Sequence, residues 1–401
     1  MEHKHNSIVC IAGKNEIAVY GLHLLMKYVN KDKILVVYNI KDDPEPGFNT
    51  WQPSLLKAAK ENNIRIISIE EFYSLDNIIF LSLEFYKIIT PEKFSNSELF
   101  NIHFSKLPSY KGMYTSALPI LNNESEAGVT LHEIDSGIDT GDIVDQITFP
   151  IEKEDSVRDL YFKYLENSKK LLEKNISIIL KRETISYPQP PEASTYFSSK
   201  TIDYKNLEVK LFATADQVRN QIRAFFFPEY QVPKVHGFFV NFAIINTDKS
   251  TNKPGEILSI TEDHIIISTI DYNVTLLRDK NSELIESAIN NDKRFALECI
   301  ECGANINYRY GKNGMTPLLT ASINGSIDIV KLLIKSGADI NLSDYQGNTS
   351  LMYAMKNYEK NGKRNLFDFL IQNGGDIELK DIHSKTIKDY AIQRNIFGLF
   401  K

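Results

Sequence analysis

The chain has 401 residues, too many for one hydrophobic core, so we expect two or three domains. Hydrophobic residues make up 42% of it and charged residues 24%, which is the composition of an ordinary globular protein rather than a disordered one. The net charge of -6 provides no general basic surface for nucleic acid. Since no stretch approaches the roughly 20 apolar residues that cross a bilayer, we also expect no membrane partner.

The first residues, MEHKHNSIVCIAG, lack the apolar core and the small-residue cleavage site of a signal peptide, so we expect a cytoplasmic location. The three cysteines, Cys10, Cys299 and Cys302, are too few and too oddly numbered for a disulfide framework. Cys299 and Cys302 form a CxxC without a second ligand pair nearby. We therefore expect packed thiols and no metal site.

Residues 1–200 are predicted to form a Rossmann-like α/β domain. Short β-branched runs alternate with helical stretches, which is typical of a parallel sheet covered by helices. The predicted strands are SIVCIAG, KILVVYN, IRIISI and NIIFLSL, with PSLLKAAKEN as a helix and a longer helix over residues 156–180. The turn GKNEIA has neither the GxGxxG nor the GxxxxGK[ST] pattern, so neither a nicotinamide nor a nucleoside triphosphate is predicted there.

Residues 201–280 have a different character. Four short apolar runs separated by turn residues, FFVNFAII, GEILSI, HIIISTI and VTLLR, predict a small antiparallel β-sheet domain. The triple phenylalanine Phe225 to Phe227, which stands before a proline, is most simply read as part of its core.

Residues 281–401 contain a repeat. The fragment NGMTPLLTA returns as QGNTSLMYA after 33 residues, GANIN returns as GADIN, and GGDIELKD begins a weaker third copy. This period, with a TPLxxA motif at a helix start, is typical of ankyrin repeats, which bury one continuous core by stacking. Thr316 can cap its helix, and Pro317 suits the first helical position because its missing N–H needs no partner.

Asn101 and His103 lie near the carboxyl end of the predicted sheet. One residue separates them, so in an extended segment both side chains point to the same face, opposite Ile102 and Phe104. This alternation also fits a half-exposed strand. Their position after the strand candidate NIIFLSLEF favours a ligand site, since ligands of open α/β sheets bind at the carboxyl edge.

Two loops can complete such a site. LPSYKGMYTSALP begins four residues after His103, and HEIDSGIDTGDIVDQ comes about 35 residues on. The second loop carries Asp135, Asp139 and Asp142 together with Gly137 and Gly141, and it can bring a carboxylate close to the imidazole.

The blocks NIHFSKLPSYKG and DSGIDTGDIVDQ resemble the formyltransferases that use 10-formyltetrahydrofolate. The resemblance covers roughly the first 200 residues and implies that they form the catalytic domain. Three sequence segments are most similar to bacterial sugar N-formyltransferases, namely SLEF, NIHFSKLPSYKGMYTSALPILNNE and GVTLHEIDSGIDTGDI. The appended ankyrin repeats favour the branch of that family that acts on dTDP-linked 3-amino-3,6-dideoxyhexoses. This implies a role in surface polysaccharide (O-antigen) assembly.

The resemblance places the catalytic groups on Asn101, His103 and Asp139. An amine that attacks a formyl carbon builds negative charge on the carbonyl oxygen and positive charge on nitrogen. Asn101 can donate a hydrogen bond to that oxygen, and His103 can accept the proton at neutral pH. Asp139 can orient the imidazole and stabilise its charged form.

Further contacts are implied by the resemblance or by position. The expected folate contacts are Leu83, Ser105, Asp135 and Asp142. The two aspartates could instead be loop or solvent-exposed residues that bind no ligand. The expected contacts of the nucleotide sugar are Glu84, Tyr114, Thr115, Arg223, Tyr230 and Lys234, with Tyr230 for stacking and the two cations for pyrophosphate. Trp51 could pack over the site or beneath it.

Several alternatives remain open at this point. A 4-amino sugar and methionyl-tRNA fit the same two blocks, but residues 201–280 hold nine basic and ten acidic residues, about -1, where a tRNA-binding domain should be basic. The chain could also be an interaction protein with a degenerate front domain, against which the intact Asn101, His103 and Asp139 argue.

We expect a homodimer. Tyrosines of the ankyrin repeats could form an auxiliary nucleotide-sugar site, namely Tyr308, Tyr310, Tyr345 and Tyr353.

Overall fold

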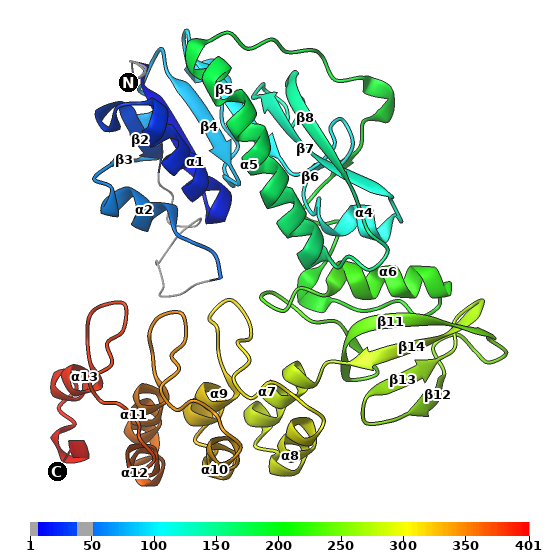
Figure 1. Ribbon diagram of the computed structural model, residues 1–401, viewed down its shortest axis with the longest axis vertical. Helices are drawn as coiled ribbons and strands as arrows, with labels where there is room; N and C mark the ends of the chain where they lie inside the picture. The colour runs from blue at the N-terminus through cyan, green and yellow to red at the C-terminus, as the bar shows by residue number, and fades with distance from the viewer. Residues whose placement is uncertain (1–6, 38–50, 401) are drawn as a thin grey trace. The chain divides into compact units, whose positions relative to one another are not determined.

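The computed structural model describes residues 7–37 and 51–400. The chain divides into two compact units (Figure 1). The first unit comprises residues 1–46 and 52–207, and the second comprises residues 47–51 and 208–401. The end of the predicted strand KILVVYN and the segment MEHKHN lie outside the described residues.

The first unit is built on a seven-stranded sheet with the strand order β3-β2-β1-β4-β5-β7-β8. Neighbours from β3 to β5 pair in parallel, whereas β7 and β8 are antiparallel. The strands of this unit are β1 (Val9–Gly13), β2 (Ile34–Val37), β3 (Arg65–Ile67), β4 (Ile79–Leu83), β5 (Glu98–His103), β7 (Glu126–Glu133) and β8 (Ile143–Pro150), together with the small pair β6 (Lys111–Gly112) and β9 (Tyr196–Phe197). The α/β fold expected for this part of the chain is confirmed.

The helices of the first unit are α1 (Asn15–Tyr28), α2 (Leu55–Glu61), α3 (Ile69–Phe72), α4 (Ala117–Leu121) and α5 (Val157–Lys181), with 3-10 turns η1 (Lys31–Lys33), η2 (Pro91–Lys93), η3 (Pro191–Ala193) and η4 (Tyr204–Asn206). α1 and α5 pack against each other on one face of the sheet (Figure 1). α5 follows a capping box of Ser156 and Asp159 and ends at Lys181, with Arg182 as its C-cap. The central strands β1, β2 and β4 are buried at every position, as expected for parallel strands that helices cover on both faces.

The order of the strands fixes where a ligand can bind. β1 pairs with β2 on one side and with β4 on the other, so the chain reverses its direction of travel across the sheet between β1 and β4. The carboxyl ends of β1, β4 and β5 meet at the same edge beside this reversal, which is where open α/β sheets bind ligands. Asn15, Glu84 and His103 all lie at that edge.

The second unit begins with a five-stranded antiparallel sheet of order β10-β11-β14-β13-β12. Helix α6 packs against β11 and β14. Between them lies a core of small and branched side chains that includes Val218, Val240, Ala243 and Leu276. The elements are α6 (Ala215–Phe225), β10 (Lys234–Val235), β11 (Phe238–Lys249), β12 (Ile257–Ile260), β13 (His264–Ile267) and β14 (Tyr272–Arg278). The small antiparallel module predicted from the sequence is confirmed.

The remainder of the second unit is a stack of helix pairs (Figure 1). Its helices are α7 (Lys280–Asn290), α8 (Lys293–Glu301), α9 (Pro317–Asn324), α10 (Ile327–Lys335), α11 (Ser350–Asn361), α12 (Asn365–Gln372) and α13 (Ile387–Gln393), followed by η5 (Phe397–Phe400). Thr316, Thr349 and Thr386 each cap a helix at the corresponding repeat position. One continuous apolar core runs from Leu284 to Leu399. The predicted ankyrin architecture is confirmed.

Within the described residues, no helix has both the length and the apolar character that crossing a bilayer would need.

Candidate active site

The pairing of β5 with β7 brings polar side chains of two strands together. In this antiparallel register, Asn101 lies opposite His132, and His103 lies opposite Thr130. Asn101 and His103 therefore share one face of β5, as the sequence predicted, while Phe100 and Ile102 are buried.

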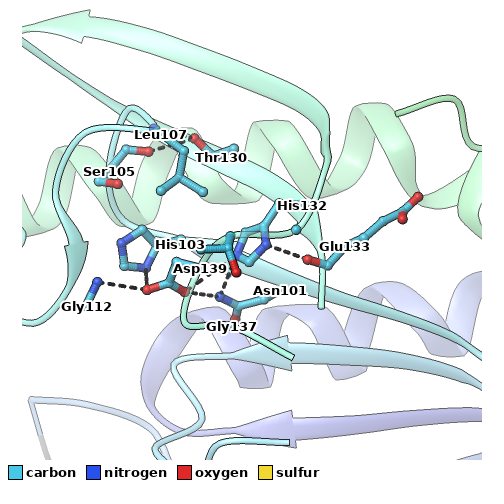
Figure 2. Close-up of polar contacts among 12 residues, drawn as sticks. Asn101, His103, Ser105, Leu107, Gly112, Thr130, His132, Glu133, Gly137 and Asp139 are labelled. Carbon is cyan, nitrogen blue, oxygen red and sulfur yellow. Dashed lines mark hydrogen bonds and ion pairs between the residues drawn. The ribbon is translucent and has the colours of Figure 1, made fainter. Parts of the chain in front are cut away.

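A hydrogen-bonded loop after β5 places backbone groups around His103. The hydroxyl of Thr130 accepts from the N–H of Leu107 at 3.2 Å and donates to the carbonyl of Ser105 at 2.7 Å (Figure 2). The Ser105 hydroxyl donates in turn to the carbonyl of Ser109 at 2.9 Å. The loop then presents the carbonyl oxygen of Tyr110 at 2.9 Å from His103 Nε2.

Gly112 ends this loop and requires the freedom of glycine. Its φ of 86° is in the left-handed region, and an added Cβ would lie 2.3 Å from the carbonyl oxygen of Phe197. Its N–H donates to Asp139 Oδ2 at 2.9 Å. The glycine thus lets the backbone come close enough to hold the carboxylate.

Asp139 lies at the centre of the group (Figure 2). Its Oδ2 is 3.5 Å from His103 Nδ1, and its Oδ1 is 3.5 Å from Asn101 Nδ2 and 3.6 Å from His132 Nε2. Its φ of 55° is unusual for a residue other than glycine, which is typical of functional sites. Gln189 supports this backbone by donating to the carbonyl of Asp139 at 2.9 Å. The three residues that the sequence predicted as catalytic are therefore adjacent.

The protonation state of His103 follows from its partners. The carbonyl of Tyr110 can only accept a hydrogen bond, so Nε2 carries the hydrogen and the lone pair is on Nδ1. Burial lowers the pKa of His103 below its ordinary value, and the charge of Asp139 opposes this shift without cancelling it. The imidazole is thus neutral near pH 7 and has an available acceptor atom.

Asp139 remains ionised. Burial by itself raises its pKa, but the charge that His103 carries when protonated and the hydrogen bond from the N–H of Gly112 act in the opposite direction, and the pKa is lowered to about 2. A carboxylate beside a neutral imidazole can stabilise that imidazole once it has accepted a proton. The group can therefore act as a base with a built-in counter-charge.

Sequence reasoning missed His132. Its side chain is 2% exposed, its Nδ1 lies 2.7 Å from the carbonyl of Glu133, and its Nε2 lies 3.1 Å from Asn101 Nδ2. The run VTLHE does alternate apolar and polar residues, with Thr130 and His132 on one face. That signal becomes informative only when β7 is known to pair with β5.

A second polar group lies at the ends of β1 and β4. The carboxylate of Glu84 accepts from Asn15 Nδ2 at 3.3 Å and from the Tyr161 hydroxyl at 3.2 Å. That hydroxyl also accepts from Gln52 Nε2 at 3.2 Å. Burial raises the pKa of Glu84 to about 7, although Lys14 and the two hydrogen bonds act in the opposite direction. Glu84 can therefore exchange a proton near neutral pH.

The residues predicted to contact folate hold the local structure. Leu83 ends β4 and is 1% exposed, and Ser105 is also 1% exposed. Asp135 accepts from the N–H of Gly137 at 3.1 Å and from the Thr140 hydroxyl at 2.7 Å. Asp135 therefore holds its own loop through its side chain, whereas Asp142 contributes its backbone carbonyl, which accepts from the N–H of Glu133. Their contact with folate stays a prediction.

Tyr114 and Thr115 follow the catalytic loop. The Tyr114 hydroxyl donates to the carbonyl of Ser199 at 2.8 Å, and its ring makes an edge contact with Tyr204. The backbone carbonyl of Thr115 accepts from the Tyr164 hydroxyl at 2.9 Å. Both residues are anchored in the first unit, and their contact with a sugar stays a prediction.

The predicted nucleotide contacts lie in the second unit and differ in their surroundings. The ring of Tyr230 makes edge contacts with Trp51 at 5.3 Å and with Phe227 at 4.8 Å between ring centroids. Arg223 is 5% exposed and donates to Asn220 Oδ1 at 3.0 Å.

The third predicted nucleotide contact, Lys234, has an acidic partner. Its Nζ lies 2.6 Å from Glu286 Oε1, and it also lies over the ring of Phe239. A pyrophosphate would have to compete with that carboxylate.

The ankyrin tyrosines are not equally available to a ligand. Tyr345 is 7% exposed, and its ring packs over Gly314 and beneath Arg309. Tyr353 is also 7% exposed and donates to Asp344 Oδ2 at 2.5 Å. Both therefore belong to the packing of the repeats. Tyr308 and Tyr310 are less buried, and an auxiliary site there stays a prediction.

The cysteines are part of the packing or lie at a helix end. Cys10 and Cys299 are buried in the cores of the two units, and Cys302 Sγ lies 3.6 Å from Glu262 Oε2. In the part of the chain that the structure describes, no cluster of three or more His, Cys, Asp or Glu side chains is placed to hold a metal ion.

Comparison with known proteins matches both parts of the chain. Residues 18–176 match the formyl transferase family, and residues 284–381 match ankyrin repeats in three copies. Methionyl-tRNA formyltransferase from Synechococcus sp. (strain JA-3-3Ab) is 29% identical over 181 residues, which cover 45% of this chain and 54% of that protein. The chain thus spans about half the length of the first curated relatives it matches.

Two solved structures are more similar. WlaRD, described as a sugar 3N-formyl transferase in the presence of dTDP and 5-N-formyl-THF, is 44% identical with a TM-score of 0.62, and the match covers 68% of this chain and 98% of WlaRD. The N-formyltransferase from Helicobacter canadensis, in complex with folinic acid and dTDP-3-aminofucose, is 42% identical with a TM-score of 0.62, and the match covers 68% of this chain and 100% of that one. The two matches cover nearly the whole length of WlaRD and of the Helicobacter canadensis protein and 68% of this chain. With these identities, and with an amide, an imidazole and a carboxylate adjacent at the sheet edge, this chain belongs to the N-formyltransferase family.

Proposed function

We propose that this protein transfers a formyl group from 10-formyltetrahydrofolate to the amine of a dTDP-linked 3-amino-3,6-dideoxyhexose. The observation that carries the proposal is the contact of Asp139 with both His103 and Asn101 at 3.5 Å. The choice of sugar is supported by the two similar structures, whose descriptions name dTDP and dTDP-3-aminofucose. Their folate ligands support the choice of formyl donor.

In this proposal His103 is the general base. 10-Formyltetrahydrofolate supplies an activated formyl group, and the sugar amine attacks its carbon. His103 Nδ1 then accepts the proton that the nitrogen loses, because Nε2 is already bonded to the carbonyl of Tyr110. Asp139 stabilises the resulting imidazolium. The same proton can return from His103 to the leaving nitrogen of the folate, so the protein ends the reaction unchanged.

Asn101 is the proposed donor to the oxygen that becomes negatively charged. Its amide nitrogen has two hydrogens, of which one is directed to His132 at 3.1 Å and the other to Asp139 at 3.5 Å. The second contact is long for a hydrogen bond, so a stronger acceptor can replace it. Donors of this kind contribute roughly 3 kcal/mol to transition-state stabilisation in other enzymes.

Aromatic rings of the second unit support binding of a nucleotide base. Trp51, Phe227 and Tyr230 form a mutual edge-to-face group, and Lys312 Nζ lies 4.8 Å from the centre of the Tyr230 ring. Rings of this type can stack on a flat base such as thymine. We propose Tyr230 as the stacking residue, with Arg223 and Lys234 as candidates for the pyrophosphate.

Methionyl-tRNA is the second candidate acceptor, because the first curated relatives act on it by name. The charge of about -1 over residues 201–280 argues against it, since a tRNA-binding domain needs basic side chains to neutralise phosphates. Formylation that falls steeply with added salt, and only with methionyl-tRNA, would support this alternative.

The test of the proposed function is a substrate panel. The purified chain is given 10-formyltetrahydrofolate and, one at a time, dTDP-linked 3-amino and 4-amino sugars in the gluco and galacto configurations, with methionyl-tRNA as a further acceptor. We expect one formyl group to be added to a 3-amino sugar, as detected by product mass. Formylation of methionyl-tRNA alone would overturn the proposal. The polysaccharide role, the cytoplasmic location and the homodimer stay predictions.

A further inference from the structure

His132 occupies a position that the reaction above does not use directly. It is the cross-strand partner of Asn101 in the β5–β7 register and is 2% exposed. Its ring lies edge-on to that of His103, with 6.4 Å between the centroids. The titratable groups that face it are His103 on β5 and Asp139 on the loop after β7.

The hydrogen bonds of His132 determine which of its nitrogens is an acceptor. Nδ1 lies 2.7 Å from the carbonyl of Glu133, and a carbonyl can only accept, so Nδ1 carries the hydrogen. In the neutral ring Nε2 is then an acceptor, and it lies 3.1 Å from the amide nitrogen of Asn101. Asn101 therefore donates to His132.

This bond determines the orientation of the Asn101 amide. His132 Nε2 and Asp139 Oδ1 are both acceptors, so the amide must direct its nitrogen to them and its oxygen away. The bond to His132 is the shorter one, at 3.1 Å against 3.5 Å. It holds one hydrogen of the amide and leaves the other available for the reacting oxygen.

We propose that His132 is a positioning residue that orients the Asn101 amide so that its second hydrogen can stabilise the formyl oxygen. The inference rests on the proposed function, because it assigns Asn101 the role of oxyanion donor. Without an acceptor at the position of Nε2, the amide can rotate away from the reacting oxygen. Preorganised donors lose much of their effect when they must be oriented during the reaction.

Four variants test this, of which Asn101→Ala is the reference for the double variant. His132→Leu removes the acceptor, whereas His132→Gln keeps one near the position of Nε2 but cannot become charged. We expect kcat to fall by roughly tenfold to a hundredfold in His132→Leu and by less than about fivefold in His132→Gln, with the KM for both substrates within about threefold of the wild-type value. The double variant Asn101→Ala/His132→Leu should be no slower than Asn101→Ala alone, because residues that act through one bond are not additive.

The pattern of losses distinguishes positioning from other roles. Equal losses in His132→Leu and His132→Gln, or additive losses in the double variant, would overturn the inference. Loss of the acidic limb of the kcat/KM profile in His132→Gln would also overturn it, because His132 would then be the base.

A spectroscopic measurement tests the bond without any turnover. In the full-length protein labelled with ¹⁵N-histidine, His132 should have a protonated Nδ1 and an unprotonated Nε2, and its Nε2 resonance should move in Asn101→Ala. A protonated Nε2 on His132 would overturn the inference whether or not the enzyme formylates the proposed sugar. Absence of formylation in the wild-type protein, with the expected spectrum, would instead count against the proposed function alone.

Discussion

Replacing Asp139 with asparagine removes the charge that stabilises protonated His103. The magnitude follows from the structure. The pKa of Asp139 falls from 3.8 to about 2, so its surroundings favour its charge by about 2 kcal/mol. A direct estimate for two charges 3.5 Å apart at an effective dielectric constant near 20 gives about 5 kcal/mol as an upper bound. We therefore expect a loss of about 2–4 kcal/mol in the transition state, or roughly 30-fold to 1000-fold in kcat.

The assay is the rate of formylation with 10-formyltetrahydrofolate and the preferred dTDP-amino sugar. In Asp139→Asn the KM for each substrate should change by less than about threefold, because the lost interaction is made with the imidazolium. The acidic limb of the kcat/KM profile should also move to lower pH, since Asp139 raises the pKa of His103 in the wild-type protein.

A matched control separates catalysis from stability. Asp155 is another well-buried carboxylate of the first unit, which accepts from the N–H of Glu152 and pairs with Lys163. Asp155→Asn should lower the free energy of unfolding and leave kcat unchanged. If Asp139→Asn retained kcat within threefold of the wild-type value, the assignment of Asp139 as the counter-charge would be refuted.

Three further predictions follow from the charges. Because burial lowers the pKa of His103, kcat/KM should fall with decreasing pH through an apparent pKa below 6.5. His103→Gln should lower kcat by at least about a thousandfold. An active His103→Gln variant whose kcat/KM still falls at acidic pH would contradict this assignment. The pKa of Glu84 is about 7 in the folded protein, against an ordinary value of 4.5. The protonated carboxyl therefore contributes to the free energy of unfolding below pH 4.5, and this contribution is lost as the pH rises through 7. Glu84→Gln should therefore gain about 1–3 kcal/mol relative to wild type between pH 4.5 and pH 8 in urea unfolding, and a constant difference would argue against a buried carboxyl. Glu283 holds Arg278 through two bonds of 2.9 and 3.0 Å, and both residues are buried, so Glu283→Ala should lower the free energy of unfolding by about 3–5 kcal/mol. An unchanged transition by calorimetry would contradict that reasoning.

The sequence predicted the fold well because its signals are local. β1, β2 and β4 are continuous apolar runs in the sequence because they are buried on both faces of the sheet. The ankyrin repeats are visible directly as similar segments 33 residues apart. The alternation around Asn101 and His103 likewise needed only the geometry of one strand.

The rest of the site depends on contacts between distant segments. His132 joins the group only through the β5–β7 register, and the carbonyl of Tyr110 and the N–H of Gly112 are backbone groups that no residue type signals. The acidic partner of Lys234 lies 52 residues later in the chain, at Glu286. Such partners become visible only when the chain is folded, which explains why a lysine predicted for pyrophosphate was found paired.

The proposed function depends most directly on whether His103 takes a proton during transfer of a formyl group to a sugar amine. The decisive measurement is the mass of the nucleotide sugar after incubation of the wild-type protein and of His103→Gln with 10-formyltetrahydrofolate and a dTDP-linked 3-amino-3,6-dideoxyhexose. We expect one added formyl group with the wild-type protein and none above background, in the same time, with the variant. Equal formylation by both proteins, or none by the wild-type protein on any sugar of the panel, would contradict this expectation.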